Sequence, residues 1–269
     1  MSHYIIADPS TDGEDFWKYQ RRRHLTASDI FKFLPGDVLL DKGWWIESWM
    51  ARDSDGTQRN MNWATRQTLE RKREDFEITF RDPVAVKWGQ VEEDHNRELF
   101  EKYAGVKTRG THTLVKNDRW PYLAASLDGY IKKPEGWTGI ANPEMFDKPA
   151  QVSAALDRLG HDTYLLEMKQ TSDFGSAHWL NGKKTEPRNI IAGNFRPQPP
   201  SVPVYYRAQV LTQMAIREIP TAVAVVKAGA SHMTAHTMQL DLDWPEILDT
   251  INEEISEEME SIRKDIDNE

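Results

Sequence analysis

The chain has 269 residues, no cysteine and a formal net charge of −9. The lack of cysteine excludes disulfide bonds, thiolate nucleophiles and iron–sulfur clusters, so any bound metal must be held by oxygen or histidine. The sequence has no run of about 18 apolar residues and no signal-peptide pattern, and we therefore expect a protein that has no membrane contact and is not exported.

The negative charge is concentrated at the C-terminal end of the sequence. Eleven acidic and two basic residues lie between Asp243 and Glu269, so this segment carries the whole charge of −9 and residues 1–242 are neutral. A neutral body can still form a local basic groove, and the overall charge therefore does not exclude DNA as a partner.

The spacing of apolar residues predicts both helices and strands. Helices are expected at residues 14–23, in a short stretch that begins after Ser28 as N-cap, and at 44–52, 62–76, 85–103, 205–217 and 243–266. Strands are expected at residues 111–117, 122–131, 163–171, 221–229 and 232–240. This pattern predicts one α/β domain over residues 1–269, with a mixed central β-sheet flanked by helices and an acidic helix at its C-terminal end.

Two segments are longer than ordinary connections between elements. They are residues 132–162 and residues 181–203, the second of which is rich in proline, asparagine and basic residues. Loops of this length are uncommon unless they have a function. We expect both to be insertions at the working edge of the sheet.

Two apolar strands carry charged side chains. Asp128 follows one apolar stretch, and Glu167 and Lys169 lie two residues apart in TYLLEMKQT, hence on one face of another strand. If these strands are neighbours, the two carboxylates, the ammonium group and the carbonyl of Met168 converge. Such oxygen ligands suit Mg²⁺ or Mn²⁺, and Lys169 could orient or deprotonate a water molecule that attacks phosphorus.

Each half of this pattern also has an ordinary explanation. Asp-Gly is common in turns, and a Glu-x-Lys pair on a strand is commonly a solvated ion pair. The apolar settings of Asp128, Glu167 and Lys169 favour a site, because burial of charges without a metal or a partner is costly.

A strand ending in Asp followed by a strand with Glu-x-Lys resembles the signature of the PD-(D/E)XK nucleases. Other stretches resemble the lambda exonuclease-like branch of that group, also called the YqaJ-like viral recombinases. The matching blocks are RRRHLTAS with Arg21 and Ser28, WGQVEEDHNRELF with Gly89 and Glu93, AASLDG with Asp128, LLEMK with Glu167 and Lys169, and YYRAQV with Tyr206 and Gln209. They follow the order of the family and cover most of residues 20–215. The chain departs from the family at Leu127, where the usual residue is proline, and in the long stretch between Asp128 and Glu167.

The resemblance implies a restriction-endonuclease-like core with a two-metal centre. Asp128, Glu167 and the carbonyl of Met168 would bind Mg²⁺, for which Mn²⁺ could substitute. Glu93 would complete the second metal position or position water. From its local sequence alone, Glu93 could equally be an exposed helix acid.

The resemblance also implies roles for residues that bind no metal. Lys169 would activate the attacking water, and Gln209 would help to hold the site. Arg21 and Ser28 would bind a 5′-terminal phosphate, a task that suits a guanidinium group and a hydroxyl at the start of a helix. Local sequence offers simpler explanations for this pair, namely a solvent-facing arginine and an N-cap serine.

The activity that the resemblance implies is that of a metal-dependent DNA exonuclease, acting 5′→3′ on linear double-stranded DNA in phage-type recombination. Expected partners are double-stranded DNA, a single-strand annealing protein and further copies of the chain in a homo-oligomer, in the cytoplasm of a bacterial or phage-infected cell. Two alternatives stay open. One is a structure- or site-specific endonuclease of the same fold, and the other is a non-catalytic DNA-binding or interaction protein.

Overall fold

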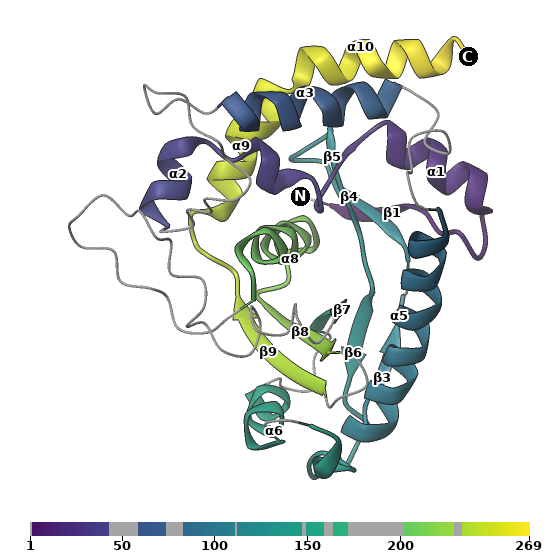
Figure 1. The fold of residues 1–269 in the computed structure, drawn as a ribbon, viewed down its shortest axis with the longest axis vertical. Coiled ribbons are helices and arrows are strands. Elements are labelled where there is room, and N and C mark those ends of the chain that lie inside the picture. Colours follow the sequence, from purple (N-terminus) through teal and green to yellow (C-terminus); the bar gives the residue numbers. More distant parts are fainter. Residues whose placement is uncertain are drawn as a thin grey trace.

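The computed structural model describes residues 2–42, 59–73, 83–110, 112–146, 149–158, 164–171, 202–228 and 233–269. These residues form two mixed β-sheets with helices packed around and between them (Figure 1). The predicted α/β class, with a mixed sheet flanked by helices, is confirmed. A second, smaller sheet accompanies the central one.

The smaller sheet has the strand order β1-β4-β5-β2. Its strands are His3–Ala7 (β1), Leu114–Asn117 (β4), Leu123–Ser126 (β5) and Leu25–Thr26 (β2). β4 runs antiparallel to β1 and β5, whereas β2 runs parallel to β5 and pairs Thr26 with Ala124. Parallel neighbours end at the same edge of a sheet, so the turn with Ser28 leaves the sheet at the edge where β5 leads to Asp128.

The larger sheet has the strand order β3-β6-β7-β8-β9. Its strands are Lys107–Arg109 (β3), Gly129–Lys132 (β6), Tyr164–Thr171 (β7), Thr221–Ala228 (β8) and Met233–Gln239 (β9). β7 and β8 are parallel, and the other neighbours are antiparallel. Because β7 and β8 are covered on both faces, apolar residues fill nearly all their central positions, and Glu167 and Lys169 are the exceptions.

The apolar stretch 122–131, expected to form one strand ending in a tight turn, instead supplies one strand to each sheet. The chain leaves β5 after Ser126 and enters β6 at Gly129, so Leu127 and Asp128 connect the sheets. The N–H of Leu127 donates to the carbonyl of Thr113 at 3.1 Å, a bond that proline at this position could not make. Asp128 is therefore positioned by both sheets.

The two faces of β7 pack against different helices. Leu165 lies in the core that contains helix α8 (Val204–Arg217), whereas Leu166 and Met168 pack with helix α5 (Pro83–Ala104) and helix α6 (Pro149–Arg158). Strand side chains alternate between faces, so Glu167 and Lys169 share the α8 side with Leu165. Figure 1 shows α8 in the middle of the molecule, between the larger sheet and the C-terminal helices.

The expected insertion 132–162 contains the short 3₁₀ helix η2 (Pro143–Met145) and α6, which pack on the face of the sheet opposite to Glu167. The apolar side chains in the described parts of this segment therefore pack on the side of the sheet away from Glu167, whereas an edge loop was expected. Of the expected insertion 181–203, residues 181–201 lie outside the described residues, as does the helix expected at 44–52.

The helices expected in the N-terminal part are found as α1 (Glu14–Arg22), the 3₁₀ helix η1 (Ile30–Phe33) and α3 (Arg59–Arg73). A further helix, α2 (Gly36–Asp41), was not predicted from the sequence. The N-cap of η1 is Asp29 and not Ser28 as predicted, and neither residue caps it through a side-chain hydrogen bond. None of the helices in the described ranges combines the length and the apolar character that a membrane-spanning helix needs.

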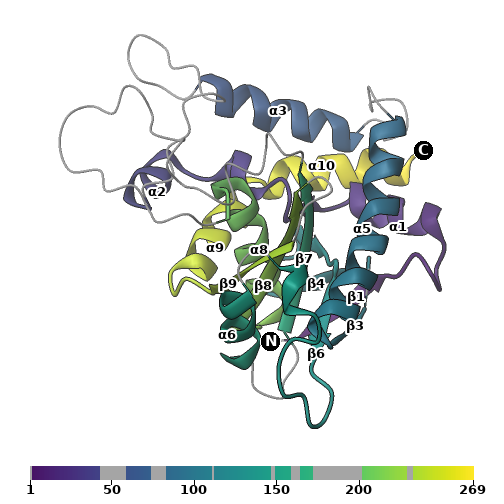
Figure 2. The same ribbon diagram turned by 60° about the horizontal axis from the view of Figure 1, so that its bottom comes forward.

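The C-terminal segment forms two helices, α9 (Trp244–Glu254) and α10 (Ser256–Asp267), where one continuous helix was expected. The interruption falls at Ile255, and the predicted apolar stripe is buried on both sides of it, with Ile251 and Met259 fully covered. Figure 2 shows α10 running alongside α3, and the two helices are in contact.

Acidic side chains of α10 pair with arginines of the N-terminal half. Arg73 pairs with Glu258 at 2.6 Å and with Asp265 at 3.3 Å, and Arg23 pairs with Asp267. Part of the acidic charge at the end of the sequence is therefore used within the chain.

Candidate active site

Three charged residues predicted from the sequence meet at the junction of β6 and β7. The antiparallel register pairs Gly129 with Leu166, so one residue further along, Asp128 comes opposite Glu167 and shares its face of the sheet. The Nζ atom of Lys169 lies 2.5 Å from Oε1 of Glu167 and 3.9 Å from Oδ2 of Asp128. The expected convergence of two carboxylates and one ammonium group is thus present.

Both oxygens of Glu167 accept hydrogen bonds from helix α8. Gln209 donates to Oε1 at 2.5 Å, as expected for a residue that holds the site, and Gln213 donates to Oε2 at 2.7 Å. Gln213 also donates to the carbonyl of Ser126 at 3.0 Å, which links β5 of one sheet to β7 of the other. Glu167 is fully buried, and these bonds fix its orientation.

Met168 contributes its main chain to the same site. Its N–H donates to Oδ2 of Asp128 at 2.8 Å. The N–H and C=O of one strand residue point to the same side of the strand, so the carbonyl of Met168 is directed to the Asp128 side as well. The pairing of β6 with β7 ends at Leu166, which leaves Met168 beyond the last residue pair on that side.

Glu93 of α5 completes the acidic group. Burial, and next the negative charge of Asp128, raise the pKa of Glu93 to about 9, and a hydrogen bond to Asp128 adds to this effect. Its Oε1 atom is buried and has no hydrogen-bond partner among the described residues. A buried carboxyl group next to other carboxyl groups needs either a proton or a cation.

The same crowding affects the charges on β7. Burial, followed by the charge of Asp128, raises the pKa of Glu167 to about 7, while Lys169 opposes this shift. Burial alone would lower the pKa of Lys169, but the charges of Glu167 and Asp128 outweigh burial and raise it above its ordinary value. Lys169 is therefore an ammonium group in this arrangement.

The oxygen groups at this site are of the chemical type that binds a hard divalent cation. Three carboxyl groups face one ammonium group, Glu93 has an orphan oxygen, and a main-chain carbonyl is directed to the same place. In the described part of the chain, no three acidic or histidine side chains surround one point in the way that ligands surround a bound ion. In this arrangement Lys169, Gln209 and Gln213 contact the oxygens of Glu167.

The two predicted phosphate-binding residues lie in a second charged cluster. Arg21 of α1 lies over the ring of Trp17 at 4.9 Å, and Ser28 is exposed and lies 3.0 Å from Thr26 between hydroxyl oxygens. Burial lowers the pKa of Arg21, and the charge of Asp29 opposes this effect. Asp29 directly follows Ser28 in the sequence, and its charge acts on Arg21, so both predicted residues lie near Asp29.

Two lysines share the carboxylate of Asp29. Lys32 pairs with it at 2.9 Å and the buried Lys72 of α3 at 3.6 Å. Burial, together with the charge of Arg21, lowers the pKa of Lys72 to about 8, although Asp29 opposes this. Around Asp29 there are thus three cationic side chains for one carboxylate, at the same edge of the smaller sheet as Asp128.

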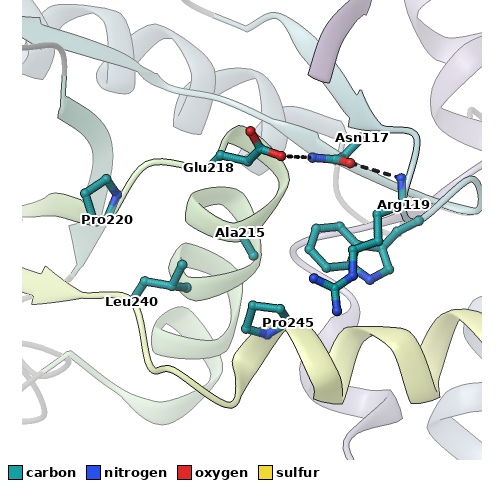
Figure 3. Close-up of a pocket in the computed structure, with 8 residues that line it drawn as sticks. Asn117, Arg119, Ala215, Glu218, Pro220, Leu240 and Pro245 are labelled. Atoms are coloured by element: carbon teal, nitrogen blue, oxygen red, sulfur yellow. Dashed lines mark hydrogen bonds between the residues drawn. The ribbon is translucent and has the colours of Figure 1, made fainter. Parts of the chain in front are cut away.

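A pocket of about 310 Å³ lies away from both clusters, on the side of α8 that faces α9 (Figure 3). Trp120, Pro220, Leu240 and Pro245 form its apolar wall. The polar groups at its rim bond to one another or to the chain, because Asn117 donates to Glu218 at 3.3 Å and Arg119 pairs with Asp249 at 2.5 Å. This pocket contains none of the predicted site residues.

Gln213 and Lys72 were not predicted from the sequence. Gln213 lies one helical turn after Gln209, so the Gln-x-x-x-Gln spacing in YYRAQVLTQM is the signal that could have found it. Lys72 lies in the basic run RKR on a helix far from Asp29 in sequence, and no spacing rule joins the two.

Similarity to known proteins extends over most of the chain and concerns its family and its fold. The sequence profile of the YqaJ-like viral recombinase domain matches residues 16–224. The solved structure of an alkaline exonuclease, LHK-Exo from Laribacter hongkongensis, is similar at 14% identity with a TM-score of 0.55, covering 93% of this chain and 94% of that chain. LHK-Exo in complex with dAMP is similar at 15% identity with the same coverage and TM-score. No curated protein sequence is significantly similar. At these identities the structural likeness shows a shared fold, which is the predicted PD-(D/E)XK fold.

Proposed function

The chain belongs to the YqaJ-like viral recombinase family, and on that premise we propose that it is a Mg²⁺-dependent exonuclease that degrades linear double-stranded DNA from 5′ ends. The observation that carries the proposal is that Asp128 and Glu167 are buried, that Lys169 lies against Glu167 on the same face of the sheet, and that Glu93 lies beside them. Buried carboxylates in excess over cations are costly unless a cation joins them.

The metal-binding residues in this proposal are Asp128, Glu167, Glu93 and the carbonyl of Met168. Bound Mg²⁺, or Mn²⁺ in its place, would supply charge stabilisation for an in-line attack on the phosphodiester and lower the pKa of water. Gln209 and Gln213 orient the carboxylate of Glu167 for this task.

Lys169 has two roles that follow from its position. As an ammonium group it neutralises part of the carboxylate charge, and it can donate a hydrogen bond to the attacking water or to a phosphate oxygen. Its raised pKa results from Glu167 and Asp128, so a cation that takes up their charge would lower this pKa and make the neutral amine, which can accept a proton, more accessible.

Arg21 and Ser28 recognise the 5′-terminal phosphate in this proposal. A phosphate carries close to two negative charges, and it would offset the excess of cations around Asp29. A guanidinium group can bind two phosphate oxygens at once. A terminal phosphate carries close to two negative charges and an internal phosphodiester carries one, so a group of cations favours the terminal phosphate. This cluster is the feature that favours an exonuclease over an endonuclease.

The names of the solved LHK-Exo structures are consistent with an exonuclease. One is named an alkaline exonuclease, and one was solved with dAMP, a mononucleotide of the type that an exonuclease releases. We further propose that the chain works as one domain beside a single-strand annealing protein, in the cytoplasm of a bacterial or phage-infected cell.

Labelled DNA tests the proposal directly. The purified protein is incubated with linear duplex carrying either a 5′-phosphate or a 5′-hydroxyl, and with closed circular duplex, in Mg²⁺ or in EDTA. We expect release of mononucleotides from the linear substrates only in Mg²⁺, faster from the phosphorylated end, with the circle intact. Nicking of the circle would favour an endonuclease, and absence of any cleavage would favour a non-catalytic DNA-binding protein.

A further inference from the structure

Two tyrosines at the start of α8 connect the catalytic lysine to the protein surface. The ring of Tyr206 lies under Lys169, with 5.3 Å between Nζ and the ring centre. The ring of Tyr205 lies against Tyr206, with 4.1 Å between ring centres and 47° between planes. Tyr206 belongs to a block that resembles the family, whereas nothing so far assigns a role to Tyr205.

Tyr205 is the exposed end of this series. Tyr205 is 44% exposed, so it is accessible from solvent while its ring lies against Tyr206, which in turn contacts Lys169. The charge of Lys169 is also among the influences on the phenol of Tyr205, whose pKa is raised by burial first and then by Tyr206. The ring is thus close to the reacting groups and accessible from outside.

The substrate that passes this ring has a flat apolar surface of its own. A strand that enters a nuclease site from a duplex end loses the stacking of its bases, and an aromatic side chain can replace part of it. Stacking is possible for every base, since each has a π-face, and it suits an enzyme that must digest any sequence.

From the proposed exonuclease function, on which this inference rests, we infer that Tyr205 stacks against the base of a nucleotide next to the scissile phosphate. In a nucleotide the sugar lies between the phosphate and the base. In the protein the ring of Tyr206 lies between Lys169 and the ring of Tyr205, so the two series have the same order. Lys169 acts at the phosphate and Tyr205 holds the base.

The test couples changes in the protein to changes in the DNA. Tyr205→Ala, Tyr205→Phe and Tyr205→Trp are compared with the wild type on duplexes whose first or second 5′ nucleotide is normal or abasic, in single-turnover release of the first nucleotide. We expect Tyr205→Ala to lower kcat/KM on normal DNA by about 5- to 100-fold, the range measured for loss of one stacked base. Tyr205→Phe and Tyr205→Trp should stay near the wild-type value because they keep the ring.

The abasic substrates separate stacking from a structural role. At the nucleotide that stacks, wild type should lose as much activity on abasic DNA as Tyr205→Ala loses on normal DNA, and the variant should lose nothing more when both changes are combined. The stacking role would be wrong if the losses from Tyr205→Ala and from the abasic substitution multiplied at the first and at the second nucleotide alike. It would also be wrong if Tyr205→Phe cleaved as slowly as Tyr205→Ala.

Two controls keep this result distinct from the proposed function itself. Tyr4 on β1 is 40% exposed, and Tyr4→Ala should leave kcat/KM unchanged. Melting temperatures show whether each variant is folded. If wild-type protein cleaves no linear duplex in Mg²⁺, both proposals are wrong, whereas wild-type cleavage without coupling between Tyr205 and a base overturns only the stacking role.

Discussion

The two charged clusters of this molecule are opposite in composition. Around Glu167, three carboxyl groups face one ammonium group, whereas around Asp29 three cationic side chains share one carboxylate. Buried or half-buried charges of unequal number are costly. This difference is the ground for proposing two ligands of opposite sign, a metal cation at the first cluster and a phosphate at the second.

The strongest test of the acidic cluster removes its central groups. Glu167→Gln keeps the shape of the side chain but removes the charge, and Lys169→Ala removes the ammonium group. We expect either change to lower the rate of DNA cleavage by at least about 10³-fold, because residues that act as a unit in catalysis fail together. Glu98→Gln, an exposed position on the same helix as Glu93, is the matched control. A folded Lys169→Ala protein with wild-type activity would refute the assigned roles.

The basic cluster is tested by the preference for 5′-phosphate. Arg21→Gln should lower kcat/KM on phosphorylated ends by about 10- to 100-fold and leave 5′-hydroxyl ends almost unaffected, because a charge-assisted bidentate contact is lost. Arg22→Gln is the control, since Arg22 donates to the carbonyl of Arg73 at 2.7 Å and pairs with Glu269. If Arg21→Gln lowered kcat/KM equally on phosphorylated and on hydroxyl ends, the basic cluster would not be a site for the 5′-phosphate.

Gln213 tests how strictly the acidic cluster must be held. Gln213→Leu removes the donor to Glu167 and leaves the size of the side chain nearly unchanged. We expect the Mg²⁺ concentration for half-maximal cleavage to rise by about 10-fold, the lower end of the effect of removing a group that orients a metal ligand. The cleavage rate at saturating Mg²⁺ should fall much less, and a variant with an unchanged Mg²⁺ requirement would contradict this role.

The pH dependence of stability tests the charge excess. Glu167 and Glu93 have pKa values raised to about 7 and about 9, so the metal-free native protein keeps protons that the unfolded chain releases near pH 4.5. Their contribution to stability is therefore complete at low pH and is lost as the pH rises through these values. Metal binds only the deprotonated carboxylates, so we expect Mg²⁺ to raise Tm more at pH 9 than at pH 6. The difference between the two pH values should disappear in Glu93→Gln combined with Glu167→Gln, and a shift of equal size at both pH values in the wild type would contradict it.

The smallest effect is expected at the surface pairs of α10. Glu258→Gln combined with Asp265→Asn removes both partners of Arg73, and all three side chains are roughly half-exposed. The free energy of unfolding should change by less than about 1 kcal/mol in urea denaturation. DNA affinity should stay the same if these acids serve only within the chain, whereas a strong gain in affinity would show that they compete with DNA for the basic cluster.

The alternation of apolar and polar residues predicted those site residues that lie on one strand. Alternation along TYLLEMKQT places Glu167 and Lys169 on one face, the apolar stretch before Asp128 indicated that residue, and the resemblance supplied Glu93 and Gln209. The sheet crossing at Leu127 was not predicted, because Asp128-Gly129 is equally compatible with an ordinary tight turn at the end of one strand. Lys72 and the position of α6 were also missed, since both depend on contacts between segments far apart in the sequence.

Gln213 donates to Ser126 in one sheet and to Glu167 in the other through a single nitrogen atom. Asp128 follows Ser126 by two residues, so the separation of the two carboxylates depends on how the sheets are seated against α8 and on neither sheet alone. A small slip between the sheets would misalign the carboxylates while every strand and helix stayed intact. On heating, this protein should therefore lose catalytic competence before it melts, and its thermal inactivation curve should lie below its unfolding curve.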